Sequence, residues 1–407
     1  MLEFTTAGES HGKALLVIVE GLPAGIEIDF AHLNGKLARR QGGYGRGGRM
    51  DIEKDRIEII SGIRAGETTG SPVGMKINNR DWKNWKQVMS PFREEIVEEA
   101  EVEINRDKRV KKVERRVTRP RPGHADLAGV YKYGLGDIRS ILERASARET
   151  AARTAAGGLL DSFLRYFDIE VISHVSELGG IEANLSEPGF QELKERVLES
   201  PLNCFDRESE ERMKALIDEV REEGDSLGGV AEIVTTPLPV GLGSHTDWRQ
   251  RLDGKLARAL MSIPAIKGVE IGPAFANASR RGSEVHDEIY FSSETGFYHE
   301  TNRAGGVEGG MTNGEPLRIR IAMKPIPTLY QPLSSVDIES GEPFKASVER
   351  SDVTAVPAAG VVGEAMVSFV LARSLREKFG GDNIRDVVAS YNNYLADREN
   401  SVREEER

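Results

Sequence analysis

The sequence predicts an α+β fold assembled from two related halves, and an internal repeat is the strongest indication of it. Gly-Glu-Ser-His-Gly at 8–12 leads to Leu-Pro-Ala-Gly-Ile at 22–26, and Gly-Asp-Ser-Leu-Gly at 224–228 leads to Leu-Pro-Val-Gly-Leu at 238–242 with the same spacing. Strand-like and helix-like patterns follow in both halves. Solenoids need many short units, whereas two long units indicate gene duplication and pseudo-twofold symmetry.

Further matches set the limits of the halves. Leu-Asn-Gly-Lys-Leu-Ala-Arg at 33–39 recurs as Leu-Asp-Gly-Lys-Leu-Ala-Arg at 252–258. We expect one compact domain that spans all 407 residues, because the duplicated parts form a single unit. Its pseudo-repeat halves lie at about 1–200 and 224–385.

The spacing between matching positions shrinks after Pro72, which predicts an insertion in the first half at about 79–120. Its composition is unusual, since residues 94–103 are acidic and residues 106–121 are strongly basic. Charge runs of this kind usually face water. We therefore interpret this insertion as a solvated excursion, that is, a surface segment whose charged side chains face water.

Composition indicates a globular protein without general affinity for polyanions. Of its residues 39% are hydrophobic and 30% charged, and the formal net charge is -11. We therefore expect neither nucleic acid nor membrane as a partner. Cys204 is the single cysteine, so a Cys/His zinc cluster is excluded and no metal is expected. The absence of a signal-like core or a membrane-length apolar run predicts a cytoplasmic location.

The first half opens with a strand and a capped helix. Residues 14–20 form a continuous apolar run typical of a buried strand, which a turn containing proline and glycine ends. Asp29 can cap a helix in which Phe30, Leu33 and Leu37 share one face. A glycine-rich loop follows this helix.

The later elements rest on similar patterns of apolar residues. Beyond Asp397 the tail is mostly charged, and we expect it to fray. We expect strands at 56–63, 73–77, 231–235, 288–291 and 317–322, helices at 150–167 and 363–379, and two charged surface helices within 188–222.

His11 is the first candidate for chemistry. The second copy of the repeat carries Leu227 in its place, while glycine, acid and serine persist, so scaffolding alone does not require the histidine. His11 precedes a strand and lies among glycines, where a ligand can approach the backbone.

His124 lies in Arg-Pro-Arg-Pro-Gly-His-Ala-Asp at 119–126. Arginine forms forked hydrogen bonds to phosphate or carboxylate, and histidine can transfer a proton near neutral pH. The segment therefore favours an anionic substrate and a general acid. Asp126 either orients His124 or caps the next segment.

The glycine-rich loop and a later segment add cations. Glycines at 43, 45 and 48 match the dinucleotide pattern, but they follow a helix instead of a strand, so a Rossmann site is rejected. A loop carrying Arg40, Arg46 and Arg49 suits phosphates, and a plain mobile surface loop is the alternative. Arg144 and Arg148 flank a helix start that Ser146 or Thr150 could cap, where anions bind well.

Two segments and one acidic residue of the second half are the remaining candidates for the functional site. Lys-Pro-Ile-Pro-Thr at 324–328 predicts a rigid turn beside a cation and a hydroxyl, and a purely structural turn is the alternative. The glycines at 305–314 let a backbone or a flat ring come close. Asp352 matches Ser146 in the repeat, so the halves again differ by an ionisable group, which favours function.

Two other classes of function fit parts of the sequence. Residues 8–12 match the G-x-S-x-G elbow of serine hydrolases, but only seven residues precede Gly8, too few for the sheet that this elbow needs. A phosphate- or RNA-binding module resting on residues 106–121 is the second class. Such a module would not require His11, His124 or Asp352.

Six motifs in order resemble chorismate synthase: those at 8–12, 121–126, 144–150, 305–311, 324–328 and 350–352. The likeness spans nearly the whole chain. It implies a carbon-oxygen lyase that converts 5-enolpyruvylshikimate 3-phosphate to chorismate and phosphate by 1,4-elimination, the last common step towards the aromatic amino acids. The resemblance also implies a need for reduced FMN without net redox change.

The same resemblance implies a β-α-β sandwich, in which helices lie between antiparallel sheets, and a homotetramer. NADPH is a possible electron source, and an external flavin reductase is a possible partner.

By resemblance, His11 protonates the departing phosphate, His124 manages the proton on reduced flavin, and Asp352 assists flavin N5 in taking the substrate hydrogen. Pro264-Ala265 departs from the family pattern, which has an amide side chain before the alanine, so only a backbone contact to flavin is expected there. Contacts to substrate or NADP are implied for Arg40, Arg46, Arg49, Arg121 and Arg148. Flavin contacts are implied for Arg144, Ala145, Ser146, Gly309, Lys324, Pro325, Ile326, Pro327, Thr328 and Arg350.

Overall fold

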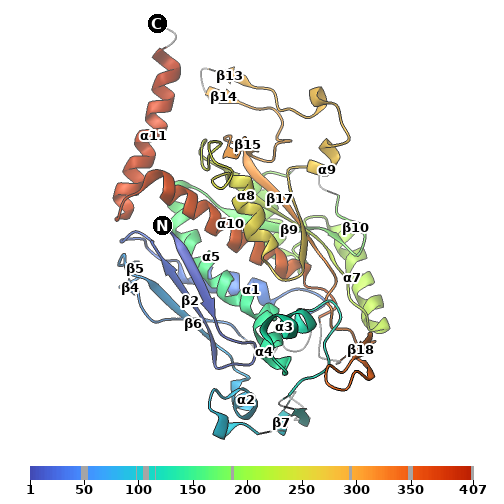
Figure 1. Ribbon diagram of the computed structural model, residues 1–407. Helices are drawn as coiled ribbons and strands as arrows, with labels where there is room; N and C mark the ends of the chain where they lie inside the picture. Colours follow the sequence, from blue (N-terminus) through green and yellow to red (C-terminus); the bar gives the residue numbers. More distant parts are fainter. Residues whose placement is uncertain are drawn as a thin grey trace.

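The computed structural model describes residues 1–46, 54–97, 99–103, 110–114, 116–184, 188–292, 296–346 and 352–404. Two predicted site residues, Arg49 and Arg350, lie outside these ranges. The mixture of helices and strands confirms the predicted α+β class. Two antiparallel sheets dominate the strand content, and helices pack on both of them (Figure 1).

The first sheet has the order β1-β2-β6-β3. Its strands are β1 (Glu3–Ala7), β2 (Ala14–Glu20), β6 (Val73–Asn78) and β3 (Ile57–Ile59), and every pairing is antiparallel. On β2, Leu15, Val17 and Val19 are buried, whereas Leu16 and Ile18 are 45% and 47% exposed. The predicted buried strand is therefore buried on one face only, as is common in antiparallel sheets.

The second sheet has the order β10-β9-β11-β17-β12 and is also antiparallel. Its central strand, β11, pairs with β9 and β17 and directs Ile233 into the core. The bounds are β9 (Val171–Leu178), β10 (Ile181–Glu182), β11 (Gly229–Pro237), β12 (Ile266–Ile271) and β17 (Pro316–Met323).

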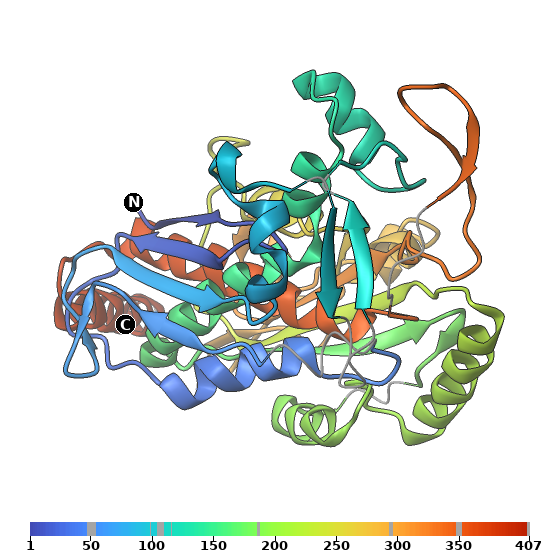
Figure 2. The same cartoon turned by 90° about the horizontal axis from the view of Figure 1, so that it is seen from below.

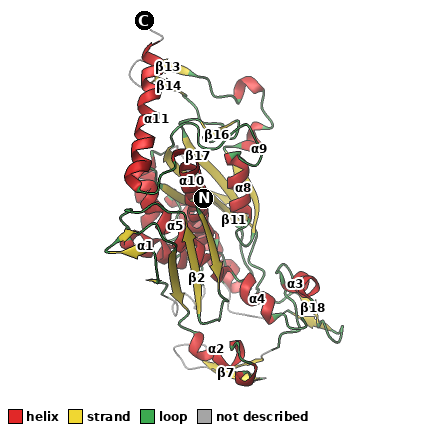
Figure 3. Cartoon of the chain, turned by 60° about the vertical axis from the view of Figure 1, so that its left-hand side comes forward, coloured by secondary structure: helices red, strands yellow, loops and turns green. Residues whose placement is uncertain are grey.

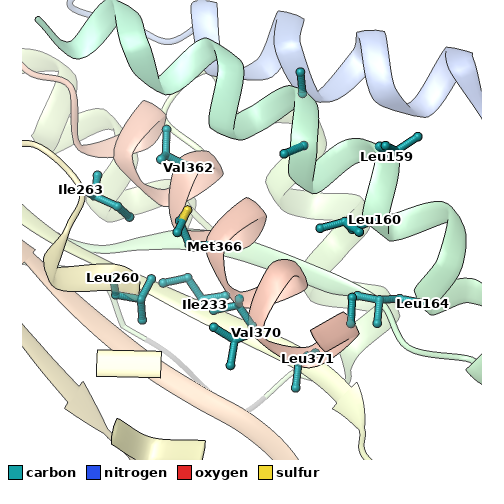
Figure 4. Packing of buried hydrophobic residues seen from close by; sticks show 14 of the residues in the cluster. Leu159, Leu160, Leu164, Ile233, Leu260, Ile263, Val362, Met366, Val370 and Leu371 are labelled. Atoms are coloured by element: carbon teal, nitrogen blue, oxygen red, sulfur yellow. The ribbon is translucent and has the colours of Figure 1, made fainter. Parts of the chain in front are cut away.

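The helices α1 (Phe30–Gln41), α5 (Thr150–Leu164) and α10 (Val356–Phe379) pack on one another. α5 packs on β2 and β6, α10 packs on β9 and β11, and the two helices pack on each other. Figure 4 shows this core, with Leu160 of α5 and Met366 of α10 on facing helices and Ile233 beneath α10.

The two sheets share an order of pairing. Strands β1, β2, β6 and β3 follow one another across the first sheet as β9, β11, β17 and β12 do across the second. A helix comes after the second strand of each set, α1 in the first half and α8 (Leu252–Met261) in the second.

Peripheral elements surround this framework. In Figure 2, α6 and α7 lie at one edge of the molecule, and Figure 3 shows α11 extending away from the core. The remaining helices are α2 (Trp82–Met89), α3 (Asp126–Tyr133), α4 (Arg139–Ala145), α6 (Phe190–Glu199), α7 (Arg207–Glu223), α9 (Ala274–Asn277) and α11 (Ile384–Glu404). Short hairpins are β4 (Ile63–Arg64) with β5 (Glu67–Thr68), β7 (Glu99–Glu103) with β8 (Val110–Glu114), β13 (Tyr290–Ser292) with β14 (Gly296–Tyr298), β15 (Val307–Glu308) with β16 (Met311–Thr312), and β18 (Ser334–Val336) with β19 (Pro343–Lys345). Single 3-10 turns lie at η1 (Arg93–Glu95), η2 (Ala147–Glu149), η3 (Arg165–Phe167) and η4 (Gly282–Glu284).

Several expected elements are confirmed, and others need correction. Asp29 caps α1 as predicted, since its Oδ1 accepts a hydrogen bond from the His32 backbone N–H at 2.8 Å. The strand expected at 56–63 covers only Ile57–Ile59, and the one expected at 288–291 is Tyr290–Ser292. The helix expected at 363–379 begins two turns earlier, at Val356.

The expectation of a frayed tail is wrong up to Glu404, where α11 ends. Tyr391 and Tyr394 pack edge-on against Phe379 of α10, and Val387 is fully buried. Apolar anchoring on α10 thus holds a helix whose later residues are mostly charged.

Helix α10 also corrects the expectation that no apolar run reaches membrane length. By length and composition α10 could cross a membrane, but 89% of its apolar window is buried inside the fold. Helix α10 packs on the second sheet and on α1, α5 and α8, and this burial accounts for its composition, because a helix enclosed on every side is apolar all round.

Candidate active site

Most predicted site residues lie in turns and at the ends of strands and helices. They occupy the turn after β1, the loop before α3, the α4–η2 junction, the end of β17 and the start of α10. In both Figure 1 and Figure 3, α3 and α4 lie close to the β18 hairpin, so segments from both halves meet there.

His11 is held by Glu143 of α4. Its backbone N–H donates to Glu143 Oε2 at 2.8 Å, and its ring Nδ1 lies 3.0 Å from Glu143 Oε1. The indole of Trp85, from α2, stacks on the imidazole with a centroid distance of 3.8 Å. The ring retains 18% exposure, so it is accessible although it is held on two sides.

The Glu143 carboxyl is fully buried beneath His11. Burial raises its pKa, but hydrogen bonds from the His11 ring and backbone and the charge of Arg139 outweigh burial and hold the pKa below its usual value. Arg139 Nη1 lies 3.4 Å from Glu143 Oε1, one helical turn away. Glu143 is therefore an ionised acceptor for the histidine.

His124 has a similar support. Its Nδ1 lies 2.5 Å from Asp126 Oδ1, and Arg121 Nε donates to Asp126 Oδ2 at 2.9 Å. Burial raises the pKa of Asp126, but hydrogen bonds from His124 and Arg121 and the charge of Arg121 hold it far below the usual range. Of the two interpretations of Asp126, the structure supports orientation of the histidine ring, because the N-cap position of α3 is taken by Ala125.

The loop around His124 is joined to the end of β17. Lys324 Nζ donates to Gly123 O at 2.5 Å, and Ser226 Oγ donates to Ile326 O at 2.8 Å. The repeat segment at 224–228 and the segment at 324–328 thus lie together. The first half contributes the histidine loop and the second half the surface on which it rests.

Asp352 lies just before α10 and pairs with Arg46, whose Nη1 is 2.7 Å from Asp352 Oδ2. The Val353 backbone N–H donates to Gly45 O at 2.9 Å, which ties the glycine-rich loop to the start of α10. The predicted cation of this loop and the predicted acid of the second half are therefore brought together.

Arg40 and Arg148 do not lie on an open surface. Arg148 is buried and donates to Asp55 Oδ2 at 2.6 Å and to Asn79 Oδ1 at 2.9 Å. Arg40 is also buried, with Nη1 3.6 Å from the same oxygen of Asp55 and Nη2 donating to Ala147 O. Asn79 in turn donates to Gly12 O at 2.7 Å, so this network supports the His11 turn from below.

Arg144 and Ser146 lie beside the same turn. The exposed guanidinium of Arg144 donates to Gly8 O and Thr6 O, both at 3.0 Å. Ser146, one of the two residues predicted as a cap, caps η2. Its Oγ lies 3.2 Å from Ser10 Oγ. Ala145 is half-buried at the end of α4.

Gly309 lies in the β15–β16 turn with φ +57°, and a Cβ there would meet only the Met311 methyl at 4.0 Å. Its surroundings therefore leave the backbone open to a flat group. Ala265 also has a positive φ, +69°, and its carbonyl accepts from the Lys324 backbone N–H at 3.0 Å.

Sequence reasoning missed three side chains of the site: Glu143, Trp85 and Asp55. Glu143 directly precedes Arg144, but its partner His11 is 132 positions away. Trp85 belongs to α2 in the predicted insertion, where the charge runs drew attention away from a helix that contacts His11.

Comparisons with known proteins match nearly the whole chain to one family. The family model described as chorismate synthase matches residues 2–375. The curated chorismate synthases of Geobacter metallireducens and Geobacter sulfurreducens are 54% and 55% identical over 402 residues, covering 97% of this chain and 98% of each relative. A crystal structure of chorismate synthase is similar with a TM-score of 0.77 and 40% identity, covering 98% of both chains. The chain therefore belongs to the chorismate synthase family of carbon-oxygen lyases.

Proposed function

We propose that the protein eliminates phosphate from 5-enolpyruvylshikimate 3-phosphate to form chorismate, with reduced FMN and without net redox change. The observation that carries this proposal is the pair of histidines, His11 and His124, each held on a buried ionised carboxylate that an arginine also contacts. We infer the reaction from family membership, and the two histidines are groups suited to proton transfer.

We assign His11 to protonation of the departing phosphate. The departing phosphate takes the electron pair of the C–O bond and needs a proton, which the imidazole can donate near neutral pH. Since Nδ1 faces Glu143, the other ring nitrogen, Nε2, is the one available to the substrate.

His124 and Asp352 are assigned to the proton on the flavin and to removal of the substrate hydrogen, respectively. Asp126 holds the His124 ring at Nδ1, so Nε2 is again the available atom. Arg46 keeps Asp352 at the edge of the glycine-rich loop, and with Arg121 it offers cationic groups to the substrate's phosphate and carboxylates. The buried contacts of Arg40 and Arg148 favour support of the His11 turn over direct contact with substrate or NADP.

The residues implied for FMN fit that group by their chemistry. Arg144 and Lys324 are cations suited to the phosphate, Ser146 and Thr328 provide hydroxyls, and Gly309 leaves its backbone open. When bound, reduced FMN supplies an electron that assists C–O cleavage and is recovered when the substrate hydrogen leaves.

The decisive experiment mixes purified protein, chemically reduced FMN and the phosphorylated substrate without oxygen. We expect chorismate and phosphate in equal amounts, and neither with oxidised FMN or without flavin. A serine hydrolase would instead release phosphate without flavin and lose activity in Ser10→Ala, and a binding module would release nothing. Either of these results would overturn the proposal.

We also propose that the halves are related by a pseudo-twofold axis that arose by duplication, with the helical layer of the sandwich between them. The shared pairing order of the two sheets and the matched positions of α1 and α8 support this. The insertion then comprises α2, η1, β7 and β8.

A homotetramer is proposed from the family resemblance. The outer face of the first sheet supports an association, because Leu16 and Ile18 on β2 are about half exposed there. Light scattering should give four times the 44.8 kDa mass of the chain. A monomer in solution would contradict this assignment.

We further infer a cytoplasmic enzyme whose flavin is reduced by NADPH or by an external reductase. Cys204 is buried, and burial raises the pKa of its thiol to about 11, which suits a cysteine that stays reduced. NADPH oxidation by the purified protein with FMN alone would distinguish the two electron sources.

A further inference from the structure

The Glu143 carboxylate accepts from two donors of one residue. Oε2 accepts the His11 backbone N–H at 2.8 Å, and His11 Nδ1 lies 3.0 Å from Oε1 and 3.1 Å from Oε2. An ionised carboxylate accepts hydrogen bonds and donates none, so the ring nitrogen facing it must carry a hydrogen. Nε2 is then the nitrogen that takes up the second proton, and the imidazolium gives that proton to the departing phosphate.

The carboxylate itself has little freedom to rotate. Its side chain is fully buried, and Arg139, one turn earlier on α4, lies 3.4 Å from Oε1. The α4 backbone also holds the turn, because the Ser10 N–H donates to Glu143 O at 3.0 Å. The histidine is thus joined to α4 through a rigid acceptor.

Trp85 fixes the plane of the same ring. Its indole stacks on the imidazole with an interplanar angle of 24°, and the indole N–H donates to Asp81 Oδ2 at 2.9 Å. Asn84 donates to the other oxygen of Asp81 at 2.7 Å. The stacking surface is therefore itself anchored at the start of α2.

We propose that Glu143 and Trp85 are positioning residues for proton transfer by His11: Glu143 fixes the hydrogen on Nδ1, and Trp85 fixes the ring plane, so that Nε2 is presented to the substrate. This proposal rests on the function proposed for His11. It gives α2 of the insertion a part in the reaction without contact to the reacting atoms.

Glu143→Gln tests the positioning role. It removes the negative charge and replaces one accepting oxygen with a donating amide. If the remaining oxygen stays at the Oε2 position, beside the backbone N–H, the amide lies beside Nδ1 and weakens the preference for a hydrogen on that atom. The same exchange at Glu232 is a matched control, because Glu232 is a buried carboxylate between His174 and Arg318 in the second sheet.

The experiment compares Glu143→Gln, Glu143→Asp and Glu232→Gln in protein labelled with ¹⁵N-histidine, with His11→Ala to assign the His11 signals. We expect the neutral His11 ring to shift towards the tautomer with its hydrogen on Nε2 in Glu143→Gln only. With chemically reduced FMN, kcat should fall about 10-fold with KM within about twofold, because the imidazolium loses the carboxylate charge that supports it, whereas complete loss of a general acid costs about 10²–10⁴-fold. Glu143→Asp keeps the charge and should retain the tautomer, with an intermediate kcat if one donor is lost.

Trp85→Phe and Trp85→Ala test the second residue. Phenylalanine retains an aromatic face and should keep at least about half of kcat, whereas alanine should lower kcat about 3-fold or more. Wild-type tautomer and kcat in both Glu143 variants would overturn the positioning role. If the tautomer moves but wild-type protein makes no chorismate, the proposed function fails while the control of His11 by Glu143 stands. Should Glu143→Gln fail to fold, the tautomer and kcat of Glu143→Asp and Trp85→Ala decide the outcome.

Discussion

Three histidines of this chain have the same kind of support, a carboxylate that also contacts an arginine. They are His11 with Glu143, His124 with Asp126, and His174 with Glu232. Only the pair at 124 and 126 is close in sequence, which is why Asp126 alone could be predicted as an orienting residue. His174 is buried in the second sheet, so a supported histidine marks function only where its ring also remains accessible.

Loss of either accessible histidine should slow the reaction without unfolding the protein. His11→Ala and His124→Ala are each expected to lower kcat by about 10-fold or more, because each removes a group assigned to proton transfer. The measurement is chorismate formation with chemically reduced FMN. His245→Ala, at an exposed position, serves as the control, and unchanged rates in both site variants would count against their roles.

The arginines show where residue-scale prediction fails. Arg40 and Arg148 were chosen because arginines near a glycine loop and a helix start suit anions. Their burial depends on Asp55, which is 93 positions from Arg148, and no local pattern reveals such a partner. Arg46, by contrast, was predicted from the same reasoning and remains near the candidate site, paired with Asp352.

At the scale of elements, the contact between α5 and α10 depends on a missing side chain. A Cβ at Gly157 would lie 2.3 Å from the Ala365 Cβ and 2.4 Å from its Cα, both on α10. Contacts this short cannot be relieved by a rotamer change, because the obstructing atoms belong to the backbone and to a Cβ. The absence of a side chain at Gly157 thus sets the distance between α5 and α10.

Gly157→Ala should therefore destabilise the fold by about 1–3 kcal/mol through overpacking, despite the better helix propensity of alanine. Gly35→Ala in α1 is the matched exchange, because nothing lies within 4 Å of its Cβ. That variant should gain about 0.5–1 kcal/mol. Denaturant unfolding of both compares them, and equal effects would contradict this packing argument.

The sequence predicts best those elements whose determining residues lie close together along the chain. The Asp29 cap and the apolar face of α1 lie within twelve residues of each other, and β2 coincides with its predicted range. The first turns of α10 were missed because Pro357 and Gly360 resemble turn residues, although proline fits the start of a helix. Helix α11 could not be foreseen, since its stability comes from contacts with Phe379.

At the scale of the whole molecule, ionised groups are buried between the layers as well as at the site. Lys36 lies 2.7 Å from Asp161 and 3.5 Å from Glu364, and Arg39 forms two hydrogen bonds to Glu364. Burial raises the pKa of both acids, but these cations outweigh it and lower both values. The repeat predicted one unit built from two related halves, but no repeated motif could predict these buried charges.

These lowered values predict acid unfolding. Burial raises the pKa of Glu232, but His174 and Arg318 lower it to about 2 from an ordinary 4.5. A carboxyl whose folded pKa is depressed stabilises the fold above its unfolded pKa and loses that effect as pH falls through the folded value. Stability should thus fall between about pH 5 and pH 2, with Glu232 contributing on the order of 3 kcal/mol.

Denaturant titrations at several pH values measure this slope. Glu232→Gln should be less stable near neutral pH and should show a shallower decline below about pH 5. The same slope in wild type and variant would show that Glu232 does not contribute.

The position of α10 also has a consequence for biosynthesis. This helix fills the space between the sheets, yet it comes from residues 356–379 near the end of a chain of 407. On the ribosome, the first sheet can receive α5 early, whereas the second sheet is complete at Met323 and must wait for α10 with its apolar face uncovered. We expect nascent chains stalled in this interval to aggregate more readily than chains that have released α10 from the exit tunnel.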